Sequence, residues 1–223
     1  MPFHVRLAVD EDLDTLLAMR QEIANWLASR GSDQWQNPWP DERRQRGRIL
    51  SGIVRRETWL LCEGGRAVAT ISLLDYDAGN LWTGTEGGRE PALYVQRLMV
   101  RPGYMGLRIG VRLLGMACVH AVQRDLPWIR LDAWTTNVEL HHYYLRQQFH
   151  FKGYIPDKVL ERPDLAGYPS AALFERGVDT GRAGGGEAVR CARHEAKNFS
   201  TLPQNGSTTR AAEGSVKTPA LQR

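Results

Sequence analysis

Residues 101–110 read RPGYMGLRIG and join an apolar strand-like segment to an apolar helical one. Glycines at positions 103, 106 and 110 punctuate this turn. A glycine turn that opens a helix leaves backbone amides without partners at the positive end of the helix dipole, and such a site favours phosphate. The stretch is not a Walker loop, since Val111-Arg112 stands where Lys-Ser/Thr is needed, and no GxGxxG fingerprint can be aligned.

Arg108 and Arg112 lie one turn apart at the start of the expected helix. Cations there oppose the helix dipole and cost a few tenths of a kcal/mol each. A bound polyanion would turn that cost into a gain through charge-assisted contacts. The other interpretation is that both are solvated arginines on an exposed stripe, and this stretch alone leaves the two open.

Strand and helix patterns alternate on both sides of this turn, with Gly64-Gly65 supplying the turn of an early hairpin. The order predicts one α/β (α+β) domain with a mixed sheet flanked by helices. Strand patterns cover 4–9, 58–64, 67–76, 92–100, 128–134, 150–155 and 172–176. Helix patterns cover 11–29, 41–55, 107–124 and 138–149, and loops 33–40 and 80–91.

The chain has 223 residues, enough for one well-buried domain, which we place at 1–176. Segment 177–223 is rich in Gly, Ala, Ser, Thr and Arg and predicts a disordered tail. It carries seven Lys/Arg and four Asp/Glu and so accounts for most of the net charge of +4. The predicted domain is therefore nearly neutral, and nucleic-acid binding ranks low, although a partner-binding arm is the alternative for the tail.

Sequence features that are missing also limit the class of protein. Cys62, Cys118 and Cys191 form no CxxC or other metal-type spacing, so no metal site is expected. No apolar run approaches the ~20 residues that span a bilayer. The first residues, MPFHVRLAVDEDLD, turn acidic and lack the apolar core of a signal peptide. We expect a cytoplasmic protein without a membrane segment.

Two runs, VQRLMVRPGYMGLRIGVRLLGMA (95–117) and LDAWTTNVELHHYYLRQQFHF (131–151), carry a family resemblance. Together they resemble the GNAT superfamily of N-acetyltransferases, whose pattern is a strand, a Pro-x-Tyr-Arg/Gln-Gly-x-Gly-Ile/Leu-Gly loop, a helix, then spaced Asn, Tyr and Gly-Phe. The matching residues are Val100, Pro102, Tyr104, Gly106, Ile109, Gly110, Leu131, Asn137, Tyr144 and Phe149. The resemblance implies a GNAT-like mixed central sheet whose central strands splay apart.

Three residues depart from the family pattern: Met105 replaces Arg/Gln, Arg108 replaces the middle Gly, and Gln148 replaces the Gly before Phe149. If Arg108 must adopt a positive φ, its Cβ costs about 1 kcal/mol or more. If it already lies in the first helical turn, arginine is tolerated and its guanidinium can meet a phosphate. We predict the second case. Gln148 is expected to weaken a helix C-cap.

The resemblance also implies the chemistry: an amine attacks the thioester of acetyl-CoA directly in a ternary complex. Pyrophosphate would rest on the amides of Met105, Gly106, Leu107, Arg108, Ile109 and Gly110. The pantetheine arm would pair with the backbone of Leu98, Met99 and Val100 and with Asn137. Tyr144 would touch the cofactor and protonate the leaving thiolate.

Several assignments keep alternatives. Tyr144 can be a core aromatic, and Asn137 can be the N-cap of helix 138–149. The motif singles out no base among Glu90, Asp132 and Tyr94. Substrate-binding candidates come from the first helices, their aromatic loop and the late strands: Trp26, Gln34, Trp35, Trp39, Tyr94 and Tyr168.

The leading hypothesis is therefore an acetyl-CoA-dependent N-acyltransferase without a metal, acting on a small-molecule or protein amine. The alternative is a GNAT-like module that binds acyl-CoA or protein and has lost turnover, because Met105 and Arg108 depart from the loop pattern. By the same resemblance, a homodimer is possible.

Overall fold

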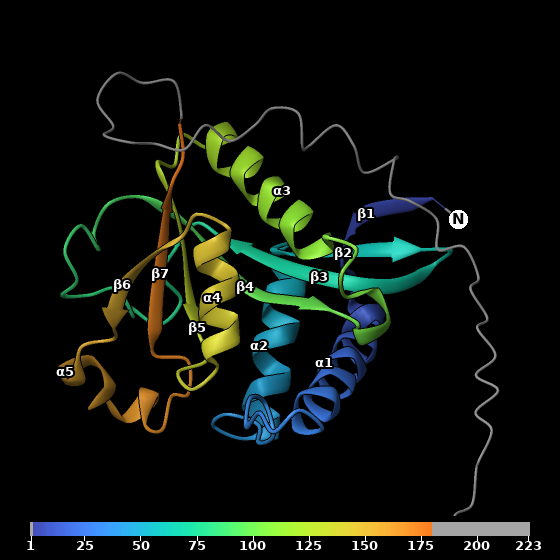
Figure 1. The fold of residues 1–223 in the computed structure, drawn as a ribbon, viewed down its shortest axis with the longest axis horizontal. Coiled ribbons are helices and arrows are strands. Elements are labelled where there is room, and N and C mark those ends of the chain that lie inside the picture. The colour runs from blue at the N-terminus through green and yellow to red at the C-terminus, as the bar shows by residue number, and fades with distance from the viewer. Residues whose placement is uncertain (1, 180–223) are drawn as a thin grey trace, which may run out of the picture.

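The structure is a computed structural model that describes residues 2–179. These residues form a seven-stranded sheet in the order β1-β2-β3-β4-β5-β7-β6, with helices on both faces (Figure 1). The strands are β1 Phe3–Leu7, β2 Thr58–Glu63, β3 Arg66–Leu74, β4 Ala92–Val100, β5 Trp128–Ala133, β6 His150–Tyr154 and β7 Ala172–Gly177. The helices are α1 Leu13–Ala28, α2 Glu42–Val54, α3 Ile109–Gln123, α4 Val138–Arg146 and α5 Asp157–Leu160, and 3-10 turns span Asp10–Asp12, Pro102–Tyr104 and Pro163–Leu165.

The predicted fold class and element order are confirmed, because the turn chemistry and apolar periods act locally. Gly64 and Gly65 have φ of +55° and +83°, as a two-residue hairpin turn between β2 and β3 requires. Asp41 caps α2, since its carboxylate accepts from the Arg44 amide at 2.8 Å.

Two layers of core hold the helices to the sheet. One cluster joins α3 and α4 to one face through residues such as Leu113, Tyr144 and Phe149. The other joins α1 and α2 to the opposite face through Met19, Ile53 and neighbours. A third cluster holds loop 77–90 and the segment between β6 and β7. The sheet therefore separates two helical layers.

The β4–β5 pair decides where a ligand can enter. The two strands are parallel, but they pair only from Ala92–Tyr94 to Trp128–Arg130. Beyond these residues β4 stays paired with β3 and β5 with β7, so a gap opens between β4 and β5. A bulge puts Arg97 and Leu98 of β4 opposite Ile71 of β3, and Arg97 takes φ +49°. Bulges of this kind bend a strand and re-aim its side chains.

The packed part extends slightly beyond the predicted boundary at residue 176. Strand β7 continues to Gly177, and Val178 is buried. The rest of the predicted tail, 180–223, lies outside the described residues. Within residues 2–179, no helix combines the length and apolar character that crossing a bilayer requires.

Candidate active site

The loop before α3 contains two left-handed residues, Gly106 (φ +84°) and Arg108 (φ +57°). The prediction that Arg108 lies in the first helical turn is wrong. Arg108 is the N-cap of α3, in the left-handed conformation with ψ 23°. A side chain there costs about 1 kcal/mol relative to glycine, because its Cβ crowds the backbone. The Arg108 side chain is exposed and forms no ion pair with the other described residues.

The same loop presents a row of free amides. Among residues 2–179, no acceptor bonds to the backbone N–H groups of residues 106–110. The Met105 amide differs, since it donates to the Pro102 carbonyl at 3.2 Å. The amides that can hold an anion therefore begin at Gly106, one residue later than predicted. Free amides at a helix N-terminus fit the phosphate groups of a coenzyme A molecule.

Close packing of α3 against α4 preserves this loop. A Cβ added to Gly110 would lie 2.5 Å from the Tyr143 hydroxyl oxygen. That hydroxyl is buried and has no hydrogen-bond partner among the described residues, and burial raises the Tyr143 pKa to about 12. Gly110 is thus required for the approach of the two helices, and Tyr143 faces the loop rather than the central cavity.

The end of β4 supplies unpaired backbone at the gap. The Arg101 amide donates to the Val68 carbonyl of β3 at 2.9 Å. Since amides alternate sides along a strand, the Met99 amide also faces β3, whereas those of Leu98 and Val100 face the gap. Met99 was predicted to pair with pantetheine, but its backbone is turned toward β3 and its side chain is buried beside α1 and α2.

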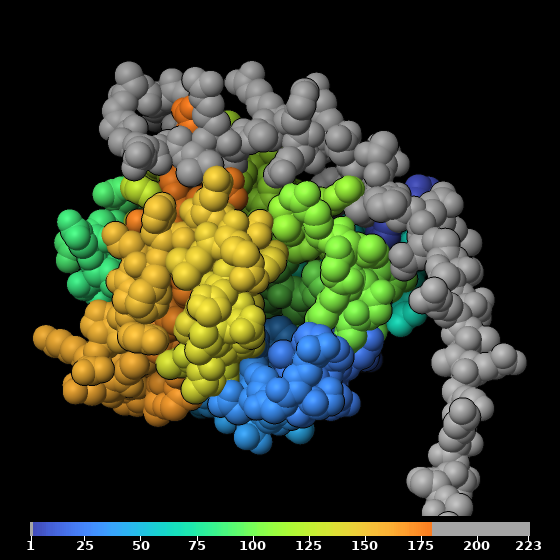
Figure 2. All heavy atoms as spheres, viewed as in Figure 1, coloured from blue at the N-terminus to red at the C-terminus, as the bar shows by residue number. Residues whose placement is uncertain are grey.

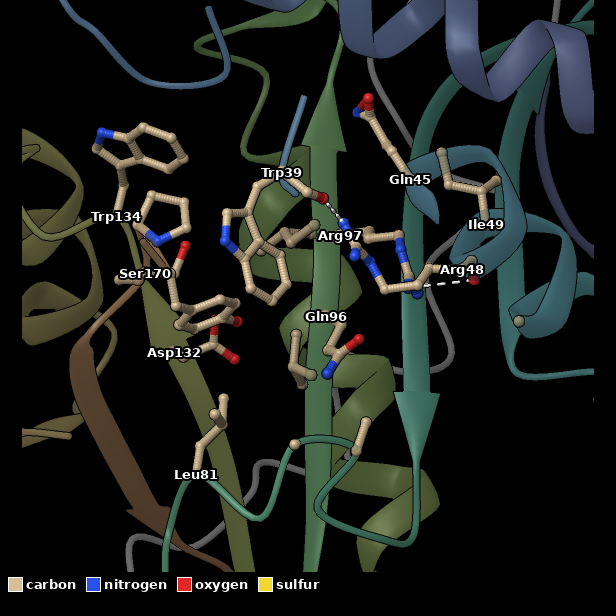
Figure 3. Close-up of a pocket in the computed structure, with 18 of the residues that line it drawn as sticks. Trp39, Gln45, Arg48, Ile49, Leu81, Gln96, Arg97, Asp132, Trp134 and Ser170 are labelled. Carbon is tan, nitrogen blue, oxygen red and sulfur yellow. Dashed lines mark hydrogen bonds between the residues drawn. The ribbon is translucent and has the colours of Figure 1, made fainter. Parts of the chain in front are cut away.

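A cavity of about 520 Å³ opens beside this gap. Figure 2 shows the surface hollowed between α4, the loop before α3, and α1. Asp132, Trp134 and Ser170 lie on one side of the cavity and Gln45, Arg48 and Ile49 on the other (Figure 3). Trp39 and Arg97 lie between the two sides in the same view.

The predicted substrate residues divide into two groups. The structure places Gln34, Trp35, Trp39 and Tyr168 in the cavity wall. It places Trp26 and Tyr94 elsewhere, so we drop both from the substrate candidates. Trp26 lies on the outside of α1 beneath the Arg30 guanidinium, and Tyr94 is 9% exposed within the third core cluster. The sequence could not show that Trp26 and Tyr94 lie outside the cavity wall. Their positions depend on how α1 and β4 are rotated relative to the neighbouring helices and strands.

Of the three base candidates, Asp132 lines the cavity, whereas Glu90 and Tyr94 do not. The Glu90 carboxylate accepts from the Trp128 indole in another part of the molecule. The Asp132 carboxylate accepts from the Tyr168 hydroxyl at 2.7 Å. Burial raises the pKa of Asp132 to about 6, against the opposing effect of the Tyr168 hydrogen bond. This carboxylate is the cavity's candidate proton acceptor.

Tyr144 lines the cavity and belongs to the core at once. Its ring contacts Phe149 and Phe174, with centroids 5.7 Å apart in both cases. Burial raises the pKa of its hydroxyl, so the phenol is protonated at neutral pH. The two interpretations of Tyr144, core aromatic and site residue, are therefore compatible.

Both ends of α4 are built from the residues in the family motif. Asn137 is the N-cap: its Oδ1 accepts from the Leu140 amide at 3.0 Å, and its Nδ2 donates to Gln34 Oε1 at 2.6 Å. At the other end Gln148 takes φ +64°, and the Phe149 amide bonds to the Tyr144 carbonyl at 3.1 Å. This is a Schellman cap with glutamine at its left-handed position, and the lower stability expected of such a cap stays a prediction.

Sequence reasoning missed four arginines in the cavity wall: Arg20 of α1, Arg48 of α2, Arg55 at the end of α2 and Arg97 of β4. Arg20 and Arg48 carry no local signal, because charged residues on helices are ordinarily solvated. Arg97 does carry one, since Gln96-Arg97 interrupts an otherwise apolar strand pattern. The bulge that turns Arg97 into the cavity could have been suspected there.

Comparison with known proteins identifies the family. The model of the Acetyltransferase (GNAT) family matches residues 20–151, which include the loop before α3 and much of the cavity. The chain belongs to the GNAT acetyltransferase family. This GNAT protein is 27% identical over 179 residues to YesJ, an uncharacterized N-acetyltransferase of Bacillus subtilis (strain 168). The match covers 79% of this chain and 91% of YesJ.

Solved GNAT structures share the fold. An acetyltransferase from Listeria monocytogenes 4b F2365 superposes with a TM-score of 0.60 at 22% identity, covering 79% of this chain and 95% of that one. PaiA N-acetyltransferase from Thermoplasma acidophilum, solved in complex with coenzyme A, gives 0.54 at 20% identity, covering 79% and 99%. The resemblance and the predicted sheet are thereby confirmed, and the family makes this protein an acyltransferase. Across residues 2–179, no three His, Cys, Asp or Glu side chains gather in a metal-binding arrangement.

Proposed function

We propose that this protein transfers an acetyl group from acetyl-CoA to an amine by direct attack in a ternary complex. One observation carries the proposal: the gap between β4 and β5 lies between the free amides of loop 106–110 and a cavity that holds Asp132 and Tyr144. A donor and an acceptor bound at these two places would meet at the gap.

The donor would be held mainly by backbone. Pyrophosphate would accept from the amides of residues 106–110, with the Arg108 guanidinium free to add a charged contact. The pantetheine arm would pair with Leu98 and Val100, whose amides face the gap. An amide there would also polarise the thioester carbonyl as negative charge develops on its oxygen. Asn137 already caps α4, and its pantetheine contact stays a prediction.

Asp132 would take up the proton that the attacking amine loses. The amine nitrogen forms a bond to the thioester carbon, and the carbon–sulfur bond breaks. A carboxylate with a pKa of about 6 is ionised at neutral pH, yet is basic enough to accept that proton. Tyr168 would hold the carboxylate in place through its hydroxyl.

Tyr144 would donate its proton to the departing thiolate, which leaves as the free thiol of coenzyme A. The phenolate then regains a proton from solvent and Asp132 releases its proton to solvent, so the products are the amide and the thiol. A phenol whose pKa is raised by burial stays protonated until the thiolate develops, and it lines the cavity beside the gap. Its partner in sequence, Tyr143, faces Gly110.

Tyr144→Phe tests the acid. We expect kcat to fall about 100-fold, because a positioned general acid contributes on the order of 10²–10⁴. Free-thiol release measures the rate, and calorimetry should show an unchanged affinity for acetyl-CoA. Tyr143→Phe is the matched control and should retain kcat, since its hydroxyl faces the loop. Equal rates for Tyr144→Phe and the wild type would remove Tyr144 as the acid.

Arg108 favours a second candidate, a module that binds acyl-CoA without turnover. Arg108 in the left-handed conformation strains the loop that would hold the donor. Replacing this arginine with glycine would relieve the strain, so its presence suits a protein that is not selected for turnover. Calorimetric binding of acetyl-CoA without thiol release across an amine panel would support this candidate. Absence of acetyl-CoA binding at high micromolar concentration would contradict both.

A further inference from the structure

The cavity carries positive charge that acetyl transfer does not require. Arg20, Arg48 and Arg97 reach it from three different elements. None of the three forms an ion pair with an Asp or Glu among residues 2–179. Figure 3 shows Arg48 and Arg97 side by side, to the right of Trp39. We call these three side chains the arginine cluster.

Within residues 2–179, the groups that accept hydrogen bonds from the arginine cluster are all neutral. Arg20 donates to the Trp35 carbonyl at 3.2 Å, and Gln45 accepts from its guanidinium when the Gln45 side-chain oxygen is turned toward it. Arg48 donates to the Trp39 carbonyl and lies 4.9 Å from the Trp39 ring. Arg97 donates to the Arg48 carbonyl at 3.2 Å. These bonds orient the guanidinium groups and leave their charge uncompensated.

The acids that line the same cavity are engaged elsewhere. Asp164 pairs with Arg162 at 2.5 Å, Asp132 accepts from Tyr168, and Glu57 accepts from Tyr76 at 3.4 Å. Glu57 and Asp132 act on Arg97 only at longer range. Burial, and then repulsion from Arg48, lower the pKa of both Arg20 and Arg97. Cations in this situation gain free energy when an anion enters.

We propose that the acceptor is a small amine that also carries a carboxylate or phosphate group, and that the arginine cluster binds this group. The proposal rests on the proposed function and names the substrate class of the same site. Guanidinium groups match both anions through paired N–H donors. Asp132 lies on the side of the cavity opposite Arg48, so the walls suit a molecule with an amine at one end and an anion at the other (Figure 3).

The walls between the charges are aromatic. Trp35, Trp39 and Tyr168 line the cavity, and the Trp39 and Tyr168 rings meet edge to face with centroids 4.7 Å apart. They would cover the carbon part of the acceptor. A polyamine would instead bring ammonium groups against three guanidinium groups, which disfavours that class of acceptor.

The experiment compares acceptors in matched pairs. Amino acids are set against their carboxamides, and aminoalkyl phosphates against the corresponding amino alcohols, with spermidine as a cationic amine. Free-thiol release gives kcat/KM, and calorimetry on the protein saturated with coenzyme A gives binding without turnover. We expect the anionic member of at least one pair to exceed its neutral partner at least about tenfold in both readouts. The preferred pair decides between carboxylate and phosphate.

Variants assign that preference to the arginine cluster. Arg97→Met and Arg48→Met should each reduce the advantage of the anionic member about tenfold, mainly through KM. Gln45→Glu keeps every arginine and should weaken anion binding by placing a carboxylate beside Arg20. Arg43→Met is the control, because Arg43 is exposed on α2 outside the cavity and should leave the preference unchanged.

The outcomes separate the two proposals. Equal use of anionic and neutral acceptors, or a preference for spermidine, would overturn the acceptor class and leave acetyl transfer standing. Binding of anionic members that depends on Arg97, without thiol release from any amine, would support the anion site and overturn the proposed function. A preference for anionic members that survives Arg97→Met, Arg48→Met and Gln45→Glu would overturn the role of the cluster.

Discussion

Two regions of the molecule hold arginines, and they treat the charge in opposite ways. Arg130 on β5 is fully buried; its Nε donates to Glu175 at 2.7 Å, and its other donors reach the carbonyls of Gly87, Gly88 and Glu90. The three carbonyls belong to loop 77–90, which Arg130 thereby holds against the sheet. In the cavity, the arginine cluster has neutral acceptors and no paired carboxylate among the described residues.

The carboxylates in the two regions differ in the same way. Glu175 lies between Arg130 and Lys152, whose Nζ is 3.7 Å from its second oxygen. Asp132 contacts a phenol, and its pKa rises to about 6. Removing one partner of a neutralised buried pair destabilises a fold strongly, whereas charges without a partner cost stability until a ligand arrives. The difference indicates which region serves structure and which serves binding.

The largest expected effect is on stability at the neutralised pair. Arg130→Met should lower the free energy of unfolding by about 3–5 kcal/mol, because it leaves Glu175 buried without its main partner. Arg97→Met should change it by less than about 1 kcal/mol or raise it, since it removes an unpaired cation. Urea denaturation at neutral pH measures both. A comparable loss of unfolding free energy in the two variants would contradict the difference between the two regions.

The second effect concerns Asp132 and pH. We expect kcat/KM to rise with pH through about 6, since the carboxylate must lose its proton before it can accept one. Asp132→Asn should lower kcat/KM about 100-fold at pH 8 and should abolish the rise of kcat/KM with pH. Rates from pH 5 to 8 with saturating acetyl-CoA measure it. If kcat/KM of Asp132→Asn rises with pH as in the wild type, the group that titrates near pH 6 is not Asp132.

The same pKa predicts the opposite trend for stability. Between about pH 4 and pH 6 the folded protein binds a proton at Asp132 that the unfolded chain has lost, so this group's contribution to stability falls as pH rises. Asp132→Asn should remove that decline and make the protein more stable at pH 8 than the wild type. Thermal unfolding at pH 4 and pH 8 compares the two proteins, and a wild type more stable than the variant at pH 8 would contradict the prediction.

The smallest effect concerns Arg108, which, like the arginine cluster, has no carboxylate partner among residues 2–179. Arg108→Gly should raise stability by about 1 kcal/mol, since glycine accepts φ +57° without strain. We expect acetyl-CoA affinity to fall a few-fold, by an amount that shrinks at high salt because the lost contact is a screened one. Calorimetry at two ionic strengths measures this. Tighter binding by the variant would show that strain outweighs phosphate contact.

The motif residues were predictable because their roles are local. The glycine turn at Gly64-Gly65, the N-cap at Asn137 and the left-handed end of α4 each depend on a few neighbours in sequence. The loop at 101–110 was recognisable for the same reason, although the conformation of Arg108 was not. The sign of φ at Arg108 depends on the residue at which α3 begins. The packing of Gly110 against Tyr143 helps to set that starting residue.

The sequence by itself determined the order of strands and helices, the family and the residues of the loop before α3, because periodicity, turn residues and capping act over a few positions. Only the tertiary structure decided which side chains share the cavity. Arg20, Arg48, Arg97 and Asp132 come from four elements, and their meeting depends on the rotation of each helix and on the bulge in β4. The same packing excluded Trp26, Tyr94 and Glu90, whose residue types were as suitable as those that line the cavity.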